Sequence, residues 1–144
     1  MKVTLIRHGA AEDRPVDALR PLSANGRRQV EELAQFIQSN ELRPQRIIHS
    51  ELLRARETAK ILHDALSGFP HLEESPSLLP VSNPEEIVGE LLVGDEDIFL
   101  VGHMPYMGLL AESLTGKPTG FITAGCLVLE RNEDSTWKVI KTNQ

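Results

Sequence analysis

The sequence contains a single cysteine, Cys126, among its 144 residues, so no disulfide can form within the chain. One unpaired thiol is typical of proteins in a reducing compartment. A signal-peptide pattern is also missing, because an apolar run that is typical of a strand begins at Val3. No apolar run approaches the length that spans a membrane. These absences predict a cytoplasmic protein without a membrane partner.

Positive charge is in short supply, since 15 Lys and Arg stand against 21 Asp and Glu, which gives a formal net charge of −6. An acidic chain is poorly suited to binding nucleic acid or an anionic membrane surface, and we expect neither partner. The arginines are unevenly distributed, because all except Arg131 lie at or before Arg56. The composition therefore still permits a local anion site built from the first part of the chain.

Signals for several other catalytic classes are absent. No Gly-x-Ser-x-Gly element surrounds a serine. Cys126 lies in an apolar strand start, which predicts a buried thiol and not the anion-binding loop of a cysteine phosphatase. His63 and His71 have no partner at metal-ligand spacing, so we predict no metal and no other cofactor.

The length fits one domain over residues 1–144, and the sequence shows no repeat or linker. Apolar runs alternate with amphipathic segments that follow capping residues. This alternation predicts an α/β fold with three layers, α/β/α, in which a largely parallel sheet ends in an antiparallel C-terminal edge. We expect strands at 2–6, 46–49, 97–101, 126–130 and 136–140, a brief strand near Leu72, and helices at about 24–39, 51–66, from Pro84, and 105–114.

The first predicted strand runs directly into Arg7, His8 and Gly9. A neutral, well-aimed imidazole can act as a nucleophile, and an adjacent guanidinium disfavours the imidazolium form. Gly9 lets the backbone turn sharply and approach a ligand. A strand end with a solvated Arg–His pair is the alternative, and the tripeptide by itself does not decide between them.

Two further predicted strands end in similar polar residues. One runs into His49 and Ser50, about one helical turn before Arg54, and another runs into Gly102 and His103. Carboxyl ends of parallel strands meet at one edge of a sheet, where ligands bind. We therefore expect Arg7, His8, Arg54 and His103 to share a pocket. Such a cluster repels itself without an anion, and guanidinium groups bind phosphate oxygens in pairs, so phosphate is the predicted ligand.

Four stretches carry a resemblance to a known family, in the family's order: Leu5–Gly9, Arg20–Ser23 with Gly26 and Gln29, Ser50–Thr58, and Val101–Pro105. On these stretches the chain resembles the histidine phosphatase superfamily, which has the phosphoglycerate-mutase-like fold. Its short length and its Arg-Pro-Leu-Ser block are most similar to the SixA-type phosphohistidine phosphatases.

The resemblance implies a role for each matching residue. His8 would attack phosphorus and carry a transient phosphohistidine, which water then hydrolyses. Arg7 and Arg54 would hold the phosphoryl oxygens, with Gly9 close by, and His103 would contact the same oxygens as a cation. Arg20 matches an additional phosphate-side arginine of the SixA group. No metal is needed in this scheme, because the arginines supply the positive charge.

The sequence departs from the family in two places. Glu51 stands where relatives usually carry proline, which we expect to matter little in the first turn of a helix. Many relatives carry a glutamate general acid after the third strand, but the matching stretch here has no acid before Glu85 and Glu86, which we expect on a solvated helix face. An alkoxide leaving group needs a proton, whereas the imidazole of a phosphohistidine leaves readily once it is protonated. Phosphohistidine is therefore the predicted substrate.

The loops at 10–22 and 67–77 are short and predict an open pocket without a lid. An open pocket suits a phosphorylated protein, such as a phosphotransfer domain, although a small phosphorylated substrate is also possible. Two alternatives are a general small-molecule phosphomonoesterase and a non-catalytic phosphate- or phosphoprotein-binding module. A nucleophile at His8 speaks against the second alternative.

Four residues that are not predicted to contact the substrate carry structural predictions. Gly26, in the first turn of a helix, indicates close packing or close approach of a ligand. Thr58 lies one turn after Arg54 and is expected to support it. His49 is expected to be structural and partly exposed, and Trp137 is expected to pack the last strand.

Overall fold

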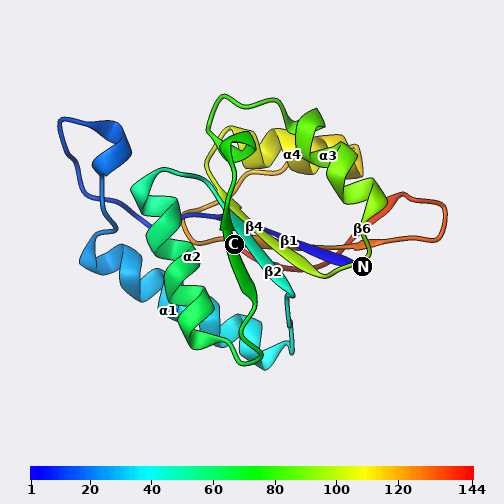
Figure 1. Ribbon diagram of the computed structural model, residues 1–144, viewed down its shortest axis with the longest axis horizontal. Helices are drawn as coiled ribbons and strands as arrows, with labels where there is room; N and C mark the ends of the chain where they lie inside the picture. Colours follow the sequence, from blue (N-terminus) through cyan, green and yellow to red (C-terminus); the bar gives the residue numbers. More distant parts are fainter.

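The computed structural model describes residues 1–144, leaving aside the side chain of Leu92. A six-stranded sheet lies between two helical layers (Figure 1). Helices α1 (Ala24–Ser39) and α2 (Leu53–Ala65) cover one face, and α3 (Pro84–Val93) and α4 (Tyr106–Thr115) cover the other. The predicted three-layer α/β/α architecture is confirmed.

The strands follow the order β3-β2-β4-β1-β5-β6 across the sheet. The first four in this order are parallel, and β5 and β6 form an antiparallel hairpin against β1, as predicted. The register between β1 and β4 pairs Arg7 with Gly102, so the residues that follow these two strands emerge side by side. The strands are β1 (Lys2–Arg7), β2 (Arg46–His49), β3 (His71–Glu74), β4 (Ile98–Gly102), β5 (Cys126–Arg131) and β6 (Trp137–Asn143).

Capping residues explain where two of the helices begin. The Ser23 hydroxyl accepts the N–H of Gly26 at 2.9 Å and starts α1. The Asn83 side chain accepts the N–H of Glu85 at 3.1 Å and starts α3, with Pro84 in its first turn. Serine and asparagine are among the residue types preferred at this position.

The predicted start of the second helix is wrong by two residues. Helix α2 begins at Leu53 after an extended Leu52, and so the exposed Glu51 lies before the helix and not in its first turn. The reason is the Ser50 hydroxyl, which accepts the N–H of Leu52 at 3.2 Å and also contacts the Nε2 of His103 at 2.7 Å. This shared hydroxyl ties the segment to β4 before the helix can start.

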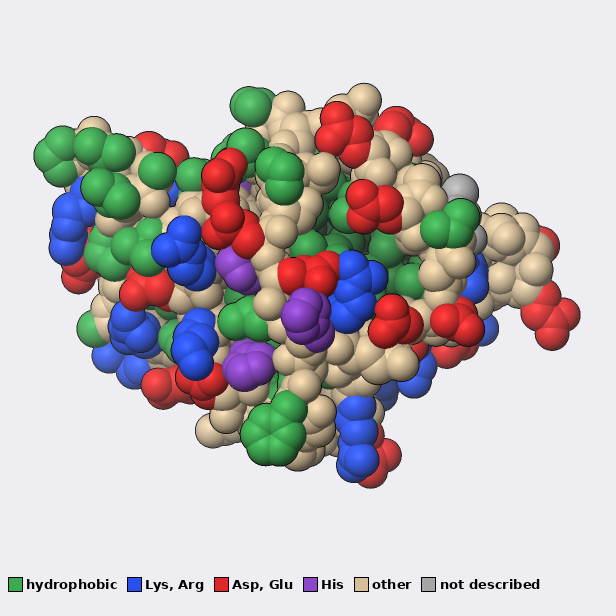
Figure 2. Space-filling view, in the orientation of Figure 1, with side chains coloured by type: hydrophobic (Ala, Val, Ile, Leu, Met, Phe, Trp, Pro, Cys, Tyr) green, Lys and Arg blue, Asp and Glu red, His purple; other side chains and the backbone are tan. Residues whose placement is uncertain are grey.

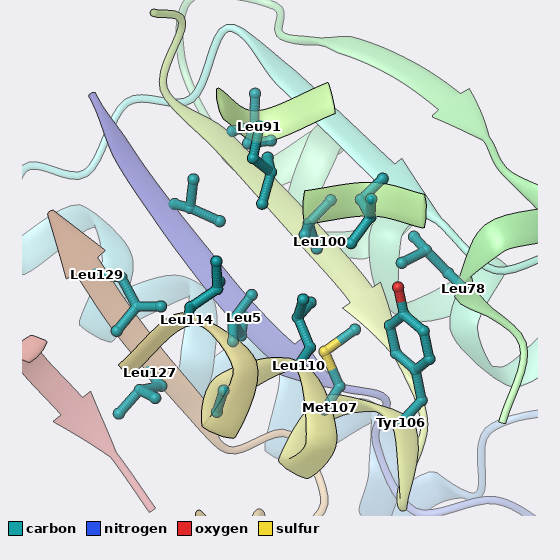
Figure 3. Close-up of a cluster of buried hydrophobic side chains, with 14 of the residues drawn as sticks. Leu5, Leu78, Leu91, Leu100, Tyr106, Met107, Leu110, Leu114, Leu127 and Leu129 are labelled. Atoms are coloured by element: carbon teal, nitrogen blue, oxygen red, sulfur yellow. The ribbon is translucent and has the colours of Figure 1, made fainter. Parts of the chain in front are cut away.

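The sheet is covered by apolar side chains on both faces, because successive strand residues point to opposite sides. On the α3/α4 side, Leu5 and Leu100 meet Tyr106 and Leu110 of α4 (Figure 3). Trp137 is buried in the same cluster, so its predicted packing role is confirmed. On the other side, strand residues such as Ile6, Val101 and Cys126 pack against α1 and α2.

The segment between β1 and α1 projects from the body at the left of Figure 1. It contains a short 3-10 helix, η1 (Asp17–Leu19), which the sequence pattern did not predict, and a bridge between Ala11 and Leu22 closes its base. A second 3-10 helix, η2 (Pro76–Leu78), follows β3. Within the part of the chain described, no helix is both long and apolar enough to cross a bilayer.

Candidate active site

The backbone of His8 is held between two strands. Its N–H donates to the Gly102 carbonyl at 3.0 Å, and its own carbonyl accepts the N–H of Ala124 at 2.9 Å. The next residue, Gly9, donates its N–H to the Thr58 hydroxyl at 3.1 Å. These bonds attach the end of β1 to β4, to the residues just before β5, and to α2. The backbone that carries the His8 imidazole is therefore held rigidly.

Gly9 and Gly26 allow α1 to press on the chain that follows His8. A Cβ on Gly9 would lie 2.8 Å from the carbonyl oxygen of Gly26, and a Cβ on Gly26 would lie 1.9 Å from that of Ala10. Neither backbone can yield easily, so both positions need glycine. The close packing predicted for Gly26 is confirmed, and the same packing accounts for Gly9.

The tautomer of His8 follows from a single contact. Its Nδ1 lies 2.6 Å from the carbonyl oxygen of Gly9, and since a carbonyl only accepts, Nδ1 carries the hydrogen. The lone pair is therefore on Nε2. Burial, and then the positive charges of Arg54, Arg7 and Arg20, lower the pKa of His8 to about 4 against the opposing bond to Gly9. His8 is neutral at pH 7, as predicted, but burial contributes more to this than the adjacent arginine.

Arg54 comes from the first turn of α2 and is only 6% exposed. Its Nη1 donates to the Asp17 carbonyl at 3.0 Å, and its Nη2 donates to the Asp17 carboxylate at 3.2 Å. The Thr58 hydroxyl donates to the carbonyl of Arg54 at 2.8 Å while it accepts from Gly9. Thr58 thus joins the helix that carries Arg54 to the residue beside His8, which confirms its supporting role.

Two further arginines flank this centre. The half-buried Arg7 donates from Nη1 to the Phe121 carbonyl at 2.8 Å, and burial lowers its pKa from the ordinary value without discharging it. Arg20 lies on the projecting segment, where its Nε donates to the Glu12 carbonyl at 3.0 Å and its Nη1 to the Asp17 carboxylate at 3.3 Å. Both lower the pKa of His8, so both lie within electrostatic range of its ring.

His103 follows β4 and faces His8, with ring centroids 5.0 Å apart and planes tilted by 54°. It is 1% exposed. Burial, and then the proximity of His8 and Arg54, lower its pKa to about 3. In the free protein a charge on His103 would be both desolvated and surrounded by positive groups, so the ring is neutral there. The expectation that His103 is a cation concerns its contact with bound phosphoryl oxygens and stays a prediction.

The hydrogen-bond pattern also assigns the tautomer of His103. The Ser50 hydroxyl accepts from Leu52, and the Nε2 of His103 is the one acceptor within reach of its hydrogen among the described residues, so Ser50 donates to Nε2. The hydrogen of the neutral ring is then on Nδ1, which is buried without a partner among the described side chains. A neutral His103 can therefore still donate one hydrogen bond.

The sequence pattern of the histidine phosphatase superfamily (branch 1) matches residues 3–78. The chain belongs to this superfamily. It is 28% identical over 133 residues to the phosphohistidine phosphatase SixA of Escherichia coli, which covers 88% of this chain and 83% of that protein. It is 35% identical over 127 residues to an uncharacterized protein of Picosynechococcus sp., which covers 83% of this chain and 76% of the relative.

The same likeness holds in three dimensions. The structure of the protein histidine phosphatase SixA complexed with tungstate superposes with a TM-score of 0.92 at 26% identity, over 99% of this chain and 96% of that one. The protein is thus a phosphatase of the histidine phosphatase superfamily, with a fold of the SixA type.

Other sequence-predicted residues of this histidine phosphatase lie elsewhere. His49 is 5% exposed, not partly exposed as expected, because its Nδ1 bonds the Ser50 carbonyl at 2.9 Å beneath the start of α2. It lines a separate cavity of about 590 Å³ beside α2 and β3, together with Arg56 and Leu72.

Within the described residues, no three His, Cys, Asp or Glu side chains are grouped to hold a metal ion. Burial raises the pKa of the Cys126 thiol to about 12, as suits a packing residue.

The structure adds one residue that the sequence pattern missed. Asp17 contacts both Arg54 and Arg20 from the projecting segment of this histidine phosphatase. Its position three residues before Arg20, in the same short loop, was the available signal. Because η1 was not predicted, that spacing did not indicate that the Asp17 carboxylate would face Arg54.

Proposed function

We propose that this phosphatase hydrolyses phosphohistidine on a protein through a covalent intermediate on His8. The observation that carries the proposal is the neutral His8, with its lone pair on Nε2, beside Arg54, Arg7 and His103. A nucleophile with a fixed lone pair and a group of positively charged donors is what in-line phosphoryl transfer requires. SixA of Escherichia coli, which is named as a phosphohistidine phosphatase, provides independent support.

In the first step, Arg7 and Arg54 hold the phosphoryl oxygens and His103 donates from Nδ1. The Nε2 of His8 attacks phosphorus, and the bond from phosphorus to the substrate nitrogen breaks. The electron pair of that bond stays on the substrate ring. If the ring is already protonated on its other nitrogen, it leaves as neutral imidazole. The Nδ1–H of His8 donates to the Gly9 carbonyl, and this hydrogen bond stabilises the positive charge that the His8 ring gains when it is phosphorylated.

In the second step, water attacks the phosphorus of the phosphorylated His8. The bond to Nε2 breaks, its electron pair returns to the imidazole, and both hydrogens of the water leave with phosphate as H₂PO₄⁻. Arg7 and Arg54 stabilise the same charge as before. His8 is restored in its neutral form, ready for another substrate.

Phosphohistidine is favoured because the candidate general acids are occupied elsewhere. Glu85 accepts a hydrogen bond from Ser113 at 2.7 Å, and Glu86 accepts one from Ser77 at 3.1 Å. Both glutamates are exposed on the first turn of α3. An ester would have to expel an alkoxide without their help, whereas a protonated phosphohistidine expels a neutral ring.

A protein is favoured as the carrier of the phosphohistidine by the surface around the site. Figure 2 shows hydrophobic side chains gathered at the upper left, where Figure 1 draws the projecting segment. Val16 and Leu19 are 54% and 62% exposed there, on either side of Asp17. An apolar pair beside the charged mouth offers contact area to a folded partner that a small phosphate would not use.

A substrate panel tests the proposal. The purified protein should turn over a phosphohistidine-bearing protein and free phosphohistidine with higher kcat/KM than p-nitrophenyl phosphate, phosphoserine or sugar phosphates. Quenching in base should trap an acid-labile phosphate that is absent from His8→Ala. Faster turnover of the esters would instead identify a small-molecule phosphomonoesterase. Phosphate binding without any trapped phosphate or turnover would identify a non-catalytic binding module.

Matched arginine variants test the transition-state role within the same panel. Arg54→Ala should lower kcat on the order of 10²-fold or more, because it removes a charge-assisted contact to the transferred group. Arg56→Ala removes an equal charge from the same helix, but that side chain is 56% exposed and pairs with Glu74. Its kcat should stay near the wild-type value. Equal losses in the two variants would remove Arg54 from the site.

A further inference from the structure

The carboxylate of Asp17 bridges two arginines at the entrance of the site. One oxygen lies 3.2 Å from the Nη2 of Arg54, and the other lies 3.3 Å from the Nη1 of Arg20. The Asp17 carbonyl accepts a further bond from Arg54 at 3.0 Å. The Asp17 side chain is 64% exposed, whereas that of Arg54 is 7% exposed, so the carboxylate lies on the solvent side of the buried guanidinium.

This position places a negative charge beside the guanidinium that is proposed to hold the phosphoryl group. Burial alone would raise the pKa of Asp17, but Arg54 and Arg20 outweigh it and hold the pKa below its ordinary value. Asp17 is therefore a carboxylate at neutral pH and has no proton to give. The negative charge of Asp17 also opposes the lowering of the pKa of His103, so Asp17 acts electrostatically on that buried ring.

The same charge acts differently on different substrates. A phosphate dianion approaching Arg54 is repelled by the carboxylate and competes with it for the guanidinium. A phosphohistidine that is protonated on its free ring nitrogen brings a positive charge and an N–H donor on the side away from the attacking His8. A carboxylate on the solvent side of Arg54 attracts that group and stabilises the protonated ring.

We propose that Asp17 determines specificity by accepting the N–H of the protonated imidazole of a bound phosphohistidine while it weakens the binding of simple phosphates. The inference rests on the proposed phosphohistidine substrate. The ring keeps its N–H throughout the transfer to His8. When the bond from phosphorus breaks, its electron pair cancels the positive charge of the ring, and neutral imidazole departs. An anion at this point keeps the leaving ring protonated, so that its departure needs no separate general acid.

The experiment compares Asp17→Asn with Glu12→Gln in the full-length protein. Both changes remove one negative charge from the same loop, but the Glu12 carboxylate pairs with Arg14 and not with Arg20 or Arg54. The readouts are kcat/KM for free phosphohistidine and for p-nitrophenyl phosphate, and the inhibition constant of inorganic phosphate. The pH profile of kcat on phosphohistidine supplies a readout that a purely structural role would not move.

Asp17→Asn should bind inorganic phosphate about threefold to tenfold more tightly, since a screened like charge has been removed. Its kcat/KM ratio of phosphohistidine to ester should fall on the order of tenfold. The alkaline limb of its kcat profile should move to lower pH, because the bound ring loses its proton more easily. Asp17→Glu should recover part of the ratio, and Glu12→Gln should match the wild type.

The inference is overturned if Asp17→Asn and Glu12→Gln behave alike, or if Asp17→Asn slows both substrates equally and weakens phosphate binding. The second result would make Asp17 only a support for Arg54. A wild-type protein that does not hydrolyse phosphohistidine ends the proposed function first, before any variant is compared. The wild-type assay therefore separates the two failures.

Discussion

His8 and His103 are buried as neutral rings, and this residue-scale feature makes the stability of the fold depend on pH. Their pKa values in the folded chain are about 4 and about 3, below the ordinary value of 6.5. As the pH falls below about 6.5, the unfolded chain takes up protons at these residues and the folded chain does not. The free energy of unfolding must therefore fall as the pH drops from about 6.5 towards about 4.

Denaturant unfolding between about pH 7 and about pH 5 measures this effect. In His8→Asn the loss of stability over that range should be smaller than in the wild type, because one of the two responsible groups is gone. In His71→Gln it should be unchanged, since that side chain is 71% exposed. An identical pH dependence in all three proteins would show that His8 is not held neutral by the fold.

At the scale of elements, the site depends on how closely α1 lies against the chain after β1. Gly26→Ala places a methyl group 1.9 Å from the Ala10 carbonyl oxygen, and so the helix or the loop must move. We expect a loss of about 1–3 kcal/mol in the free energy of unfolding, as for other overpacked sites. We also expect a lower kcat, since the displaced segment leads directly from His8 to Asp17. Unfolding and kinetics on the same preparation measure both.

Gly89→Ala is the matched control, because Gly89 is an exposed helical glycine of α3 with nothing within 4 Å of an added Cβ. Alanine should stabilise that helix by up to about 1 kcal/mol and leave kcat unchanged. If Gly26→Ala were as stable and as active as Gly89→Ala, the packing of α1 would not position the site.

Seen over the whole molecule, the sequence predicted the parts of the site that depend on strand ends. Arg7 ends β1, and His8 and His103 follow β1 and β4, so these parallel neighbours bring the three residues together. It did not predict the neutral state of His103, because burial at the centre of a domain is a property of the assembled layers. It also missed the contact of Asp17 with Arg54, which depends on how η1 folds back over α2.

The start of α2 shows the same limit for a local feature. Ser50 is a good capping residue by type, and Glu51 suits a first turn. The predicted first turn at Glu51 is nevertheless absent, and the Ser50 hydroxyl instead contacts His103, which is 53 residues away in sequence. Local signals therefore located the elements, whereas contacts between distant segments set the details of the site.

The sheet has two ends, and the proposed site residues lie at the carboxyl ends of the parallel strands. Val16 and Leu19 are exposed beside Asp17, near the carboxyl ends of the strands. If the substrate is a folded phosphoprotein, replacing both by serine should raise KM for that protein and leave kcat/KM for free phosphohistidine unchanged. A loss of about 1–3 kcal/mol of contact energy corresponds to a rise in KM of roughly fivefold to 150-fold.

Phe69 and Val93 provide the comparison, because both are 88% exposed. Phe69 lies two residues before β3 and Val93 ends α3, which leads into β4, so both belong to the opposite ends of the strands from the residues that follow β1 and β4. Serine at both positions removes a similar apolar area away from the mouth and should leave both substrates unaffected. A change for the small substrate in the Val16 and Leu19 variant would mean that these residues support the loop itself. Unchanged kinetics for the phosphoprotein would mean that its body does not touch the projecting segment, and recognition would then rest on the phosphohistidine alone.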